Sequence, residues 1–145
     1  MAQDKPDVVL LILGTNDINQ NFDPGRPGYG GGTSFAADAA QRLDSLVARL
    51  FQTNPKLTLV LATITSLADP AKEAQAEACN ACIPQIVAAH KALGQTIILA
   101  DMAAALTPAD LSPNGVHPSP AGYDKMARVW YTALTRQTLL PLPGK

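Results

Sequence analysis

The chain has 145 residues, enough for one compact domain that buries a hydrophobic core without help from metals or many disulfides. Its 11 Lys and Arg residues nearly balance 12 Asp and Glu residues and are scattered, which argues against a nucleic-acid or anionic-membrane surface. The apolar run at residues 8–13 is too short to span a bilayer and lacks the flanks of a signal peptide. We expect one soluble domain over residues 1–138 and a Pro-containing tail over 139–145.

Three apolar runs, at residues 7–13, 57–63 and 96–100, predict strands buried on both faces of a parallel sheet. A glycine-rich loop at 25–32 separates the first two and leads, through Thr33 or Ser34 as a cap, into a helix with apolar residues at helical spacing from Ala36 to Leu50.

Residues 71–93, between the second and third strands, are helical in composition, and Pro84 must start a new segment or kink an old one. An irregular stretch at 102–119 precedes a helix from Pro120, for which we predict a shared face of Tyr123, Ala127, Trp130 and Leu134. Strands alternating with helices predict an α/β fold with right-handed crossovers and a parallel sheet covered on both faces.

Cys79 and Cys82 form a Cys-x-x-Cys pair, which by itself suggests a redox motif, half a zinc site or a local disulfide. No second pair of Cys or His completes a metal set, and the pair lies within a helical stretch instead of following the first strand. A buried thiol pair or a short structural disulfide is therefore favoured, and we expect no metal and no cofactor.

Polar residues that follow strands are the candidates for chemistry, because ligands of open α/β sheets bind beyond the carboxyl ends of the strands. Gly14 follows the first strand and allows a ligand close to the backbone, and the amide of Asn16 can donate to a developing oxyanion. The alternative is a simple turn in which Asp17 bonds nearby backbone amides.

His117 lies beyond the third strand in the loop Asn114-Gly115-Val116-His117-Pro118. Core packing does not require an imidazole in such a Gly/Pro-rich loop, which favours a role as a general base. His90, the other histidine, lies beside Lys91 on a predicted helix and is interpreted as a surface residue.

Together these segments resemble the SGNH (GDSL-like) hydrolase superfamily. Residues 7–17 look like its Gly-x-Asn-Asp block, and residues 114–118 followed by Ala121-Gly122-Tyr123 look like its Asp-x-x-His-Pro block. The likeness covers residues 6–134 and is greatest to the family-three carbohydrate esterases, which deacetylate xylan. It implies a flavodoxin-like, three-layer α/β/α fold, truncated here to about three parallel strands.

The resemblance implies an acyl-transfer site in which His117 is the general base and Asn16 donates to the oxyanion beside Gly14. The family's Gly-Asp-Ser block is absent, so the nucleophile is unknown. Ser66 and Ser119 lie in other contexts, and we interpret them as loop hydroxyls that make local bonds.

Asn114 stands where the family usually has an aspartate. An amide there cannot stabilise imidazolium by charge and can select the wrong tautomer of the ring. Asp110 and Asp101 are the sequence's alternatives for the missing acid.

We therefore expect an SGNH-type esterase that acts on a small ester or an acetylated saccharide such as xylan, with weak or no activity in this truncated form. The alternatives are a non-catalytic carbohydrate-binding or pseudo-enzyme module, or an inactive fragment. No nucleic-acid or membrane partner is expected. Relatives are typically secreted, but the compartment stays open. The resembled sheet order, 2-1-3-4-5, would leave residues 7–13 as an edge strand, which predicts a homodimer through antiparallel pairing of that strand.

Overall fold

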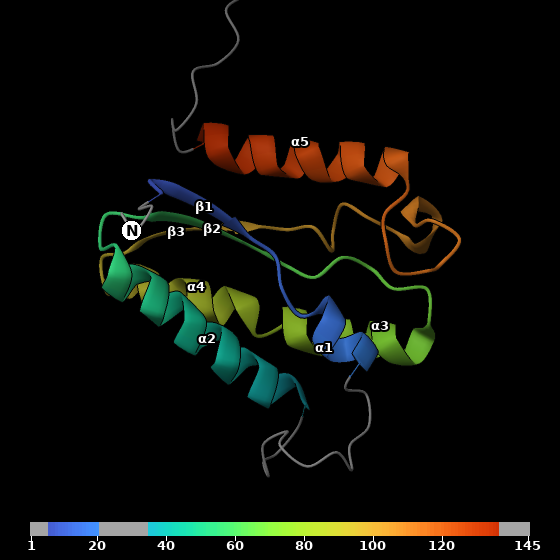
Figure 1. Ribbon diagram of the computed structural model, residues 1–145, viewed down its shortest axis with the longest axis horizontal. Helices are drawn as coiled ribbons and strands as arrows, with labels where there is room; N and C mark the ends of the chain where they lie inside the picture. The colour runs from blue at the N-terminus through green and yellow to red at the C-terminus, as the bar shows by residue number, and fades with distance from the viewer. Residues whose placement is uncertain (1–5, 21–34, 137–145) are drawn as a thin grey trace, which may run out of the picture.

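The computed structural model describes residues 6–20 and 35–136, and the following account is confined to them. In chain order the elements are β1 (Val8–Leu11), α1 (Thr15–Gln20), α2 (Phe35–Thr53), β2 (Thr58–Ala62), α3 (Pro70–Asn80), α4 (Ile83–Ala92), β3 (Thr96–Ala100), a 3₁₀ helix (Pro108–Asp110) and α5 (Pro120–Arg136). Helix α5 covers one face of the sheet, and α2 and α4 cover the other (Figure 1). The predicted three-layer α/β fold is confirmed.

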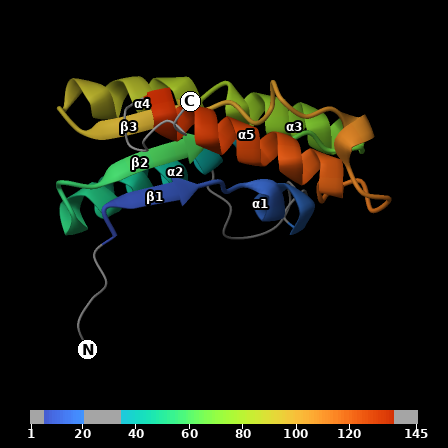
Figure 2. The same cartoon turned by 90° about the horizontal axis from the view of Figure 1, so that it is seen from above.

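The sheet consists of three parallel strands in the order β1-β2-β3, whose common direction is visible in Figure 2. The central strand β2 is buried along its whole length. Its side chains alternate between two cores: Leu59 and Leu61 face α2 and α4, whereas Val60 and Ala62 face α5. Burial on both faces explains why β2 is an unbroken apolar run and not an alternating pattern.

Strand β1 pairs only with β2 among the described residues, and it is therefore an edge strand. Val8 and Leu10 are 39% and 44% exposed, so the prediction that this strand is buried on both faces is wrong. They align with Thr58 and Val60 of β2, so they belong to the face that α5 covers, but α5 packs over β2 and β3. The edge position predicted for residues 7–13 agrees with this arrangement.

The break between α3 and α4 agrees with the prediction from Pro84. Helix α3 ends at Asn80, and Pro84 occupies the first turn of α4, where its missing N–H has no helical partner to lose. Asp69 caps α3 by accepting from the backbone N–H groups of Ala71 and Lys72.

The predicted inner face of α5 is partly wrong. Met126, Val129 and Trp130 pack against the sheet beside Leu134, whereas Ala127 is exposed and Tyr123 is 53% exposed. The first turns of α5 extend past the carboxyl ends of the strands (Figure 1). Only the later turns of α5, from Met126 onward, pack against the sheet.

The interpretation of His90 as a surface residue is also wrong. Its ring is 4% exposed and stacks on Phe51 of α2, with the ring centroids 5.9 Å apart. Nε2 lies 3.0 Å from Oδ1 of Asp44, and Nδ1 bonds Oε1 of Gln95. His90 thus joins the end of α4 to α2 and to Gln95, the residue before β3. The charged neighbour Lys91, on which the surface interpretation rested, gives no sign of these contacts.

The described residues contain no helix long and apolar enough to cross a membrane. The glycine-rich loop 25–32, its cap Thr33 or Ser34 and the tail 139–145 lie outside the described residues. The domain boundary at residue 138 stays a prediction.

Candidate functional site

Gly14 links the end of β1 to a short helix that sequence reasoning missed. Its φ is 120°, a conformation that favours glycine, and a Cβ there would lie 2.5 Å from Cδ1 of Ile64, whose side chain would have to shift. The carbonyl of Gly14 accepts from Ile18 N, which closes the first turn of α1. The alternative turn interpretation is therefore wrong, and Asp17 contacts Arg42 of α2, with Nη2 and Oδ1 3.5 Å apart.

Asn16 lies in the first turn of α1 and is exposed. The apolar neighbour Ile18 on the same helix is 1% exposed and anchors it in a cluster with Ile64 and Leu67. Burial of one side of α1 therefore turns Asn16 toward solvent beyond the carboxyl end of β1.

The His117 loop is held by backbone bonds on both sides. Ser112 N donates to the carbonyl of His117 at 2.8 Å, and Leu111 and Pro118 form an antiparallel bridge. Gly115 has a φ of 69°, and a Cβ there would lie 2.8 Å from Cβ of Ala68. The loop is therefore a constrained turn that presents an exposed imidazole.

Asn114 fixes the orientation of the imidazole through a four-bond arrangement. Its Oδ1 accepts from the backbone N–H groups of Val116 and His117, both at 2.9 Å, and from Oγ of Ser112 at 3.0 Å. The backbone donors place Nδ2 toward the ring, 2.9 Å from Nδ1 of His117. Sequence reasoning missed Ser112, which stands two residues before Asn114 in the same turn.

This geometry decides the tautomer of the neutral ring. An amide nitrogen only donates, so Nδ1 of His117 must accept, and the ring proton is then on Nε2. A general base needs a lone pair on Nε2. The neutral ring held by Asn114 therefore presents an N–H where the family's chemistry requires an acceptor.

Neither alternative carboxylate takes the place of the missing acid. Oδ2 of Asp110 accepts from Lys125 at 2.8 Å and from the N–H and hydroxyl of Thr107, and these hydrogen bonds lower the pKa of Asp110 to about 2. Oδ1 of Asp101 accepts from Thr63 and from Ala104 N. Both groups stabilise loops and have no bond to His117.

The Asn16 and His117 segments lie at the same end of the sheet. Val116 packs against the cluster that contains Ile18, and Ala68 N donates to the carbonyl of Gly115 at 2.9 Å. Figure 1 shows α1 and the loop before α5 beyond the carboxyl ends of the strands. The two segments therefore pack on the same hydrophobic cluster, although no described contact joins the Asn16 and His117 side chains.

The serine hydroxyls in the described ranges are engaged in hydrogen bonds within the domain. Ser66 is buried and donates to the carbonyl of Leu106 at 3.0 Å, and Oγ of Ser119 accepts from Gly122 N at the start of α5. Ser45 donates to the carbonyl of Gln41. The bond of Ser119 is local, as predicted. The bond of Ser66 joins residues 40 positions apart, so the prediction of a local bond is wrong for Ser66, although its hydroxyl has a structural role.

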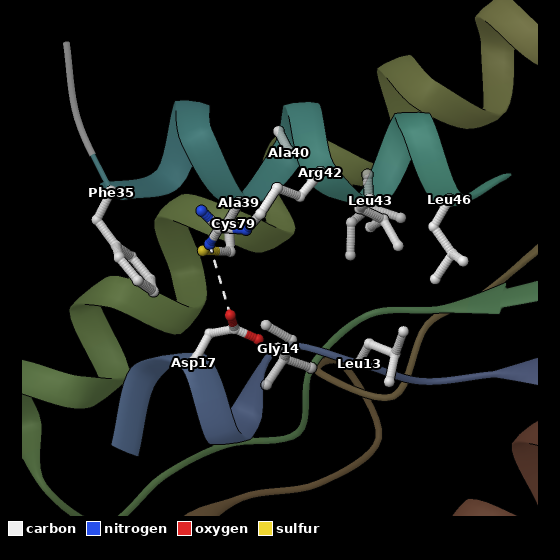
Figure 3. Close-up of a pocket in the computed structure, with 12 residues that line it drawn as sticks. Leu13, Gly14, Asp17, Phe35, Ala39, Ala40, Arg42, Leu43, Leu46 and Cys79 are labelled. Carbon is white, nitrogen blue, oxygen red and sulfur yellow. Dashed lines mark hydrogen bonds and ion pairs between the residues drawn. The ribbon is translucent and has the colours of Figure 1, made fainter. Parts of the chain in front are cut away.

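A pocket of about 130 Å³, which the sequence did not indicate, lies beside Gly14 between β1, α1 and α2 (Figure 3). Its lining is mostly apolar and includes Leu13, Phe35, Leu43, Leu46, Ile64 and Cys79, and the ion pair of Asp17 and Arg42 lies at its polar side. Burial, with Cys82 and Asp17 nearby, raises the pKa of Cys79 to about 11, so this thiol stays protonated at neutral pH.

Cys79 and Cys82 are free thiols, which agrees with the thiol-pair interpretation and not with a disulfide. Across residues 6–20 and 35–136, no three His, Cys, Asp or Glu side chains are grouped so as to hold a metal ion.

Solved structures with similar folds include carbohydrate esterases. A family 3 carbohydrate esterase from Clostridium thermocellum is 28% identical, with a TM-score of 0.69 over 91% of this chain and 57% of that chain. A family 3 carbohydrate esterase from Talaromyces cellulolyticus has a TM-score of 0.76 at 24% identity, over 92% of this chain and 59% of that one. A variant of an acetyl xylan esterase from Geobacillus stearothermophilus has a TM-score of 0.65 at 23% identity, over 97% and 63%. The last two show the fold alone.

A curated relative from Acetivibrio thermocellus is 27% identical over 128 residues, which are 87% of this chain and 49% of that protein. The chain thus spans about half the length of this relative. The sequence pattern of the GDSL-like lipase/acylhydrolase family matches residues 1–125. The chain belongs to the GDSL-like lipase/acylhydrolase family.

Proposed function

We propose that this chain provides the oxyanion-binding and histidine half of an SGNH-type esterase site, and that the whole protein removes acetyl groups from a polysaccharide such as xylan. The observation that carries the proposal is the constrained loop in which Asn114 bonds an exposed His117 at the carboxyl end of the sheet. The exposed Asn16 stands at the same end. Carbohydrate esterases among the structural relatives support acetylated saccharides as the substrate class.

In this proposal His117 acts from its minor neutral tautomer, with the ring proton on Nδ1, and takes the proton of the attacking hydroxyl on Nε2 as the carbonyl carbon of the ester is attacked. The oxyanion that develops accepts a hydrogen bond from the Asn16 amide. The structural roles of Ser66 and Ser119 leave the nucleophile unassigned.

The test is turnover of 4-nitrophenyl acetate and acetylated xylan by the wild type, His117→Ala and Arg49→Ala. Arg49 is exposed on α2 and serves as the control. If His117 is the base, its replacement abolishes any residual activity and the control retains it. Equal turnover by the wild type and His117→Ala would assign the activity to another site or a contaminant.

A non-catalytic carbohydrate-binding module is the second candidate, favoured by the structural hydrogen bonds of Ser66 and Ser119 and by the tautomer that Asn114 selects. A fluorophosphonate label distinguishes the two. Stoichiometric capture supports the esterase, whereas no capture together with saturable binding of xylo-oligosaccharides supports the module.

We also propose a homodimer in which the β1 edges pair in antiparallel fashion across a two-fold axis. Val8 and Leu10 are exposed on this edge strand, which carries no charged side chain, and Leu13 is exposed just beyond its end. These exposed apolar residues support the dimer. Leu10→Lys should shift the mass measured by light scattering from dimer to monomer, whereas Leu93→Lys, at an apolar residue that is 72% exposed elsewhere, should not. A wild-type monomer would refute this assembly. Leu10 is a cleaner site than Leu11, which packs against the core.

A further inference from the structure

A groove of about 480 Å³ runs between the outer edge of β3 and helix α5, away from the His117 loop. Three of its lining residues are basic, namely Lys91 at the end of α4 and Arg128 and Arg136 on α5. Its one acidic residue is Asp101, whose Oδ1 is occupied by Thr63 and Ala104. In a chain with a net charge of −1, this groove is a local concentration of positive charge.

The three cations are exposed and have no ion pair with any residue that the structure describes. Arg128, Thr132 and Arg136 follow one another at intervals of four residues, so they form a single row along α5. The helix rise places Arg128 and Arg136 about 12 Å apart along the axis.

The floor of the groove is the open edge of β3. Within the described residues β3 pairs only with β2, so the backbone N–H and C=O groups on its other edge have no strand partner. A strand added there would have alternate side chains toward α5, and four of its residues span about 13 Å. This repeat matches the spacing of the two arginines.

We propose that this groove binds an extended acidic peptide segment of another protein as an added strand beside β3. Two carboxylates four residues apart on one face of the segment meet Arg128 and Arg136, and acidic residues on its other face meet Lys91. A peptide fits better than an acidic polysaccharide, because the open β3 edge offers donors and acceptors at the spacing of a peptide backbone. Residues 137–145 carry no acidic side chain, so the chain's own end does not supply this partner.

A different explanation of the same cations is that they only keep other strands away from an exposed edge. The two explanations differ in what an acidic strand does, since repulsion of strands predicts no binding of any peptide. The proposal is independent of the esterase activity.

The experiment uses a ten-residue peptide, blocked at both ends, with glutamate at its third and seventh positions and valine or threonine elsewhere. Calorimetric titration measures its affinity, and amide hydrogen exchange of residues 96–100 measures strand addition. We expect saturable binding that slows exchange in β3, and about tenfold weaker binding for Arg128→Gln/Arg136→Gln or for a glutamine version of the peptide, because two exposed ion pairs are lost.

The matched control is Arg49→Gln/Lys56→Gln, which makes the same change in net charge at exposed residues outside the groove. No binding of the acidic peptide, or an equal loss of affinity in the control, would overturn the proposal. So would unchanged binding of a peptide whose alternate amides are N-methylated, because strand addition needs those groups. Tighter binding of oligogalacturonate than of the peptide would assign the groove to an acidic sugar.

Discussion

Replacing Asn114 by aspartate should reverse the tautomer of His117. In the wild type, Oδ1 of Asn114 is held by two backbone N–H groups, and Nδ2 donates to Nδ1 of the ring. An aspartate in the same position would keep one oxygen on the backbone donors and present the other, a pure acceptor, to Nδ1. The ring proton would then move to Nδ1 and leave a lone pair on Nε2.

The size of the effect follows from the hydrogen bonds at this site. A neutral bond such as Nδ2–H to Nδ1 contributes about 1 kcal/mol, and a bond to a carboxylate contributes about 2 kcal/mol. The swing between tautomers is therefore about 3 kcal/mol, or roughly 150-fold in their ratio. Because both side chains are exposed, the charge itself adds only about 1 kcal/mol to the stability of the imidazolium. Both effects lie below the roughly 10⁴-fold loss known for the corresponding swap in a buried serine-protease triad.

Long-range ¹H–¹⁵N correlation of the His117 ring nitrogens reads the tautomer directly and requires no enzymatic activity. The wild type should show the neutral ring protonated on Nε2, and Asn114→Asp should show it protonated on Nδ1. Any residual esterase activity should rise in the variant. The same tautomer in both proteins would refute the hydrogen-bond assignment, and with it the reason given for low activity.

Three further predictions concern the surroundings of the site. Gly115→Ala should lower the free energy of unfolding, measured by urea titration, by about 2 kcal/mol more than Gly94→Ala. Both glycines have positive φ, but only at Gly115 would the added Cβ meet a neighbour, 2.8 Å away. Equal losses would contradict the clash. Asp110→Asn should destabilise the protein above about pH 4, and the difference from wild type should vanish as the pH falls toward 2. The lowered pKa of Asp110 means that its carboxyl stabilises the folded state only while it is ionised. A difference in urea midpoint that does not change with pH would refute this. Dithionitrobenzoate at pH 8 should label Cys82 in the native protein well before Cys79. Cys79 is buried and has a pKa of about 11, so little of it is present as the reactive thiolate. Equal labelling rates would contradict the position of Cys79 in the pocket wall.

The fold class and the positions of the strands along the chain could be predicted from the sequence, because burial on both faces produces unbroken apolar runs that need no tertiary information to recognise. Residues 57–63 and 96–100 illustrate this, since β2 and β3 form within them. The order of the strands in the sheet came only from the family resemblance. The two polar blocks, residues 14–17 and 114–118, also carried the resemblance to the family. The structure adds a physical reason for two of their residues, because Gly14 and Gly115 have positive φ.

Long-range contacts decided the rest. His90 is buried because Asp44 and Phe51, some 40 residues earlier, surround its ring, and the neighbours of His90 in the sequence do not indicate this. The tautomer of His117 depends on which end of the Asn114 amide faces the backbone, a choice made by the closed turn. Arg128 and Arg136 lie beside β3 only because α5 returns antiparallel over the sheet. A pattern along one chain segment cannot specify which other segment lies beside it.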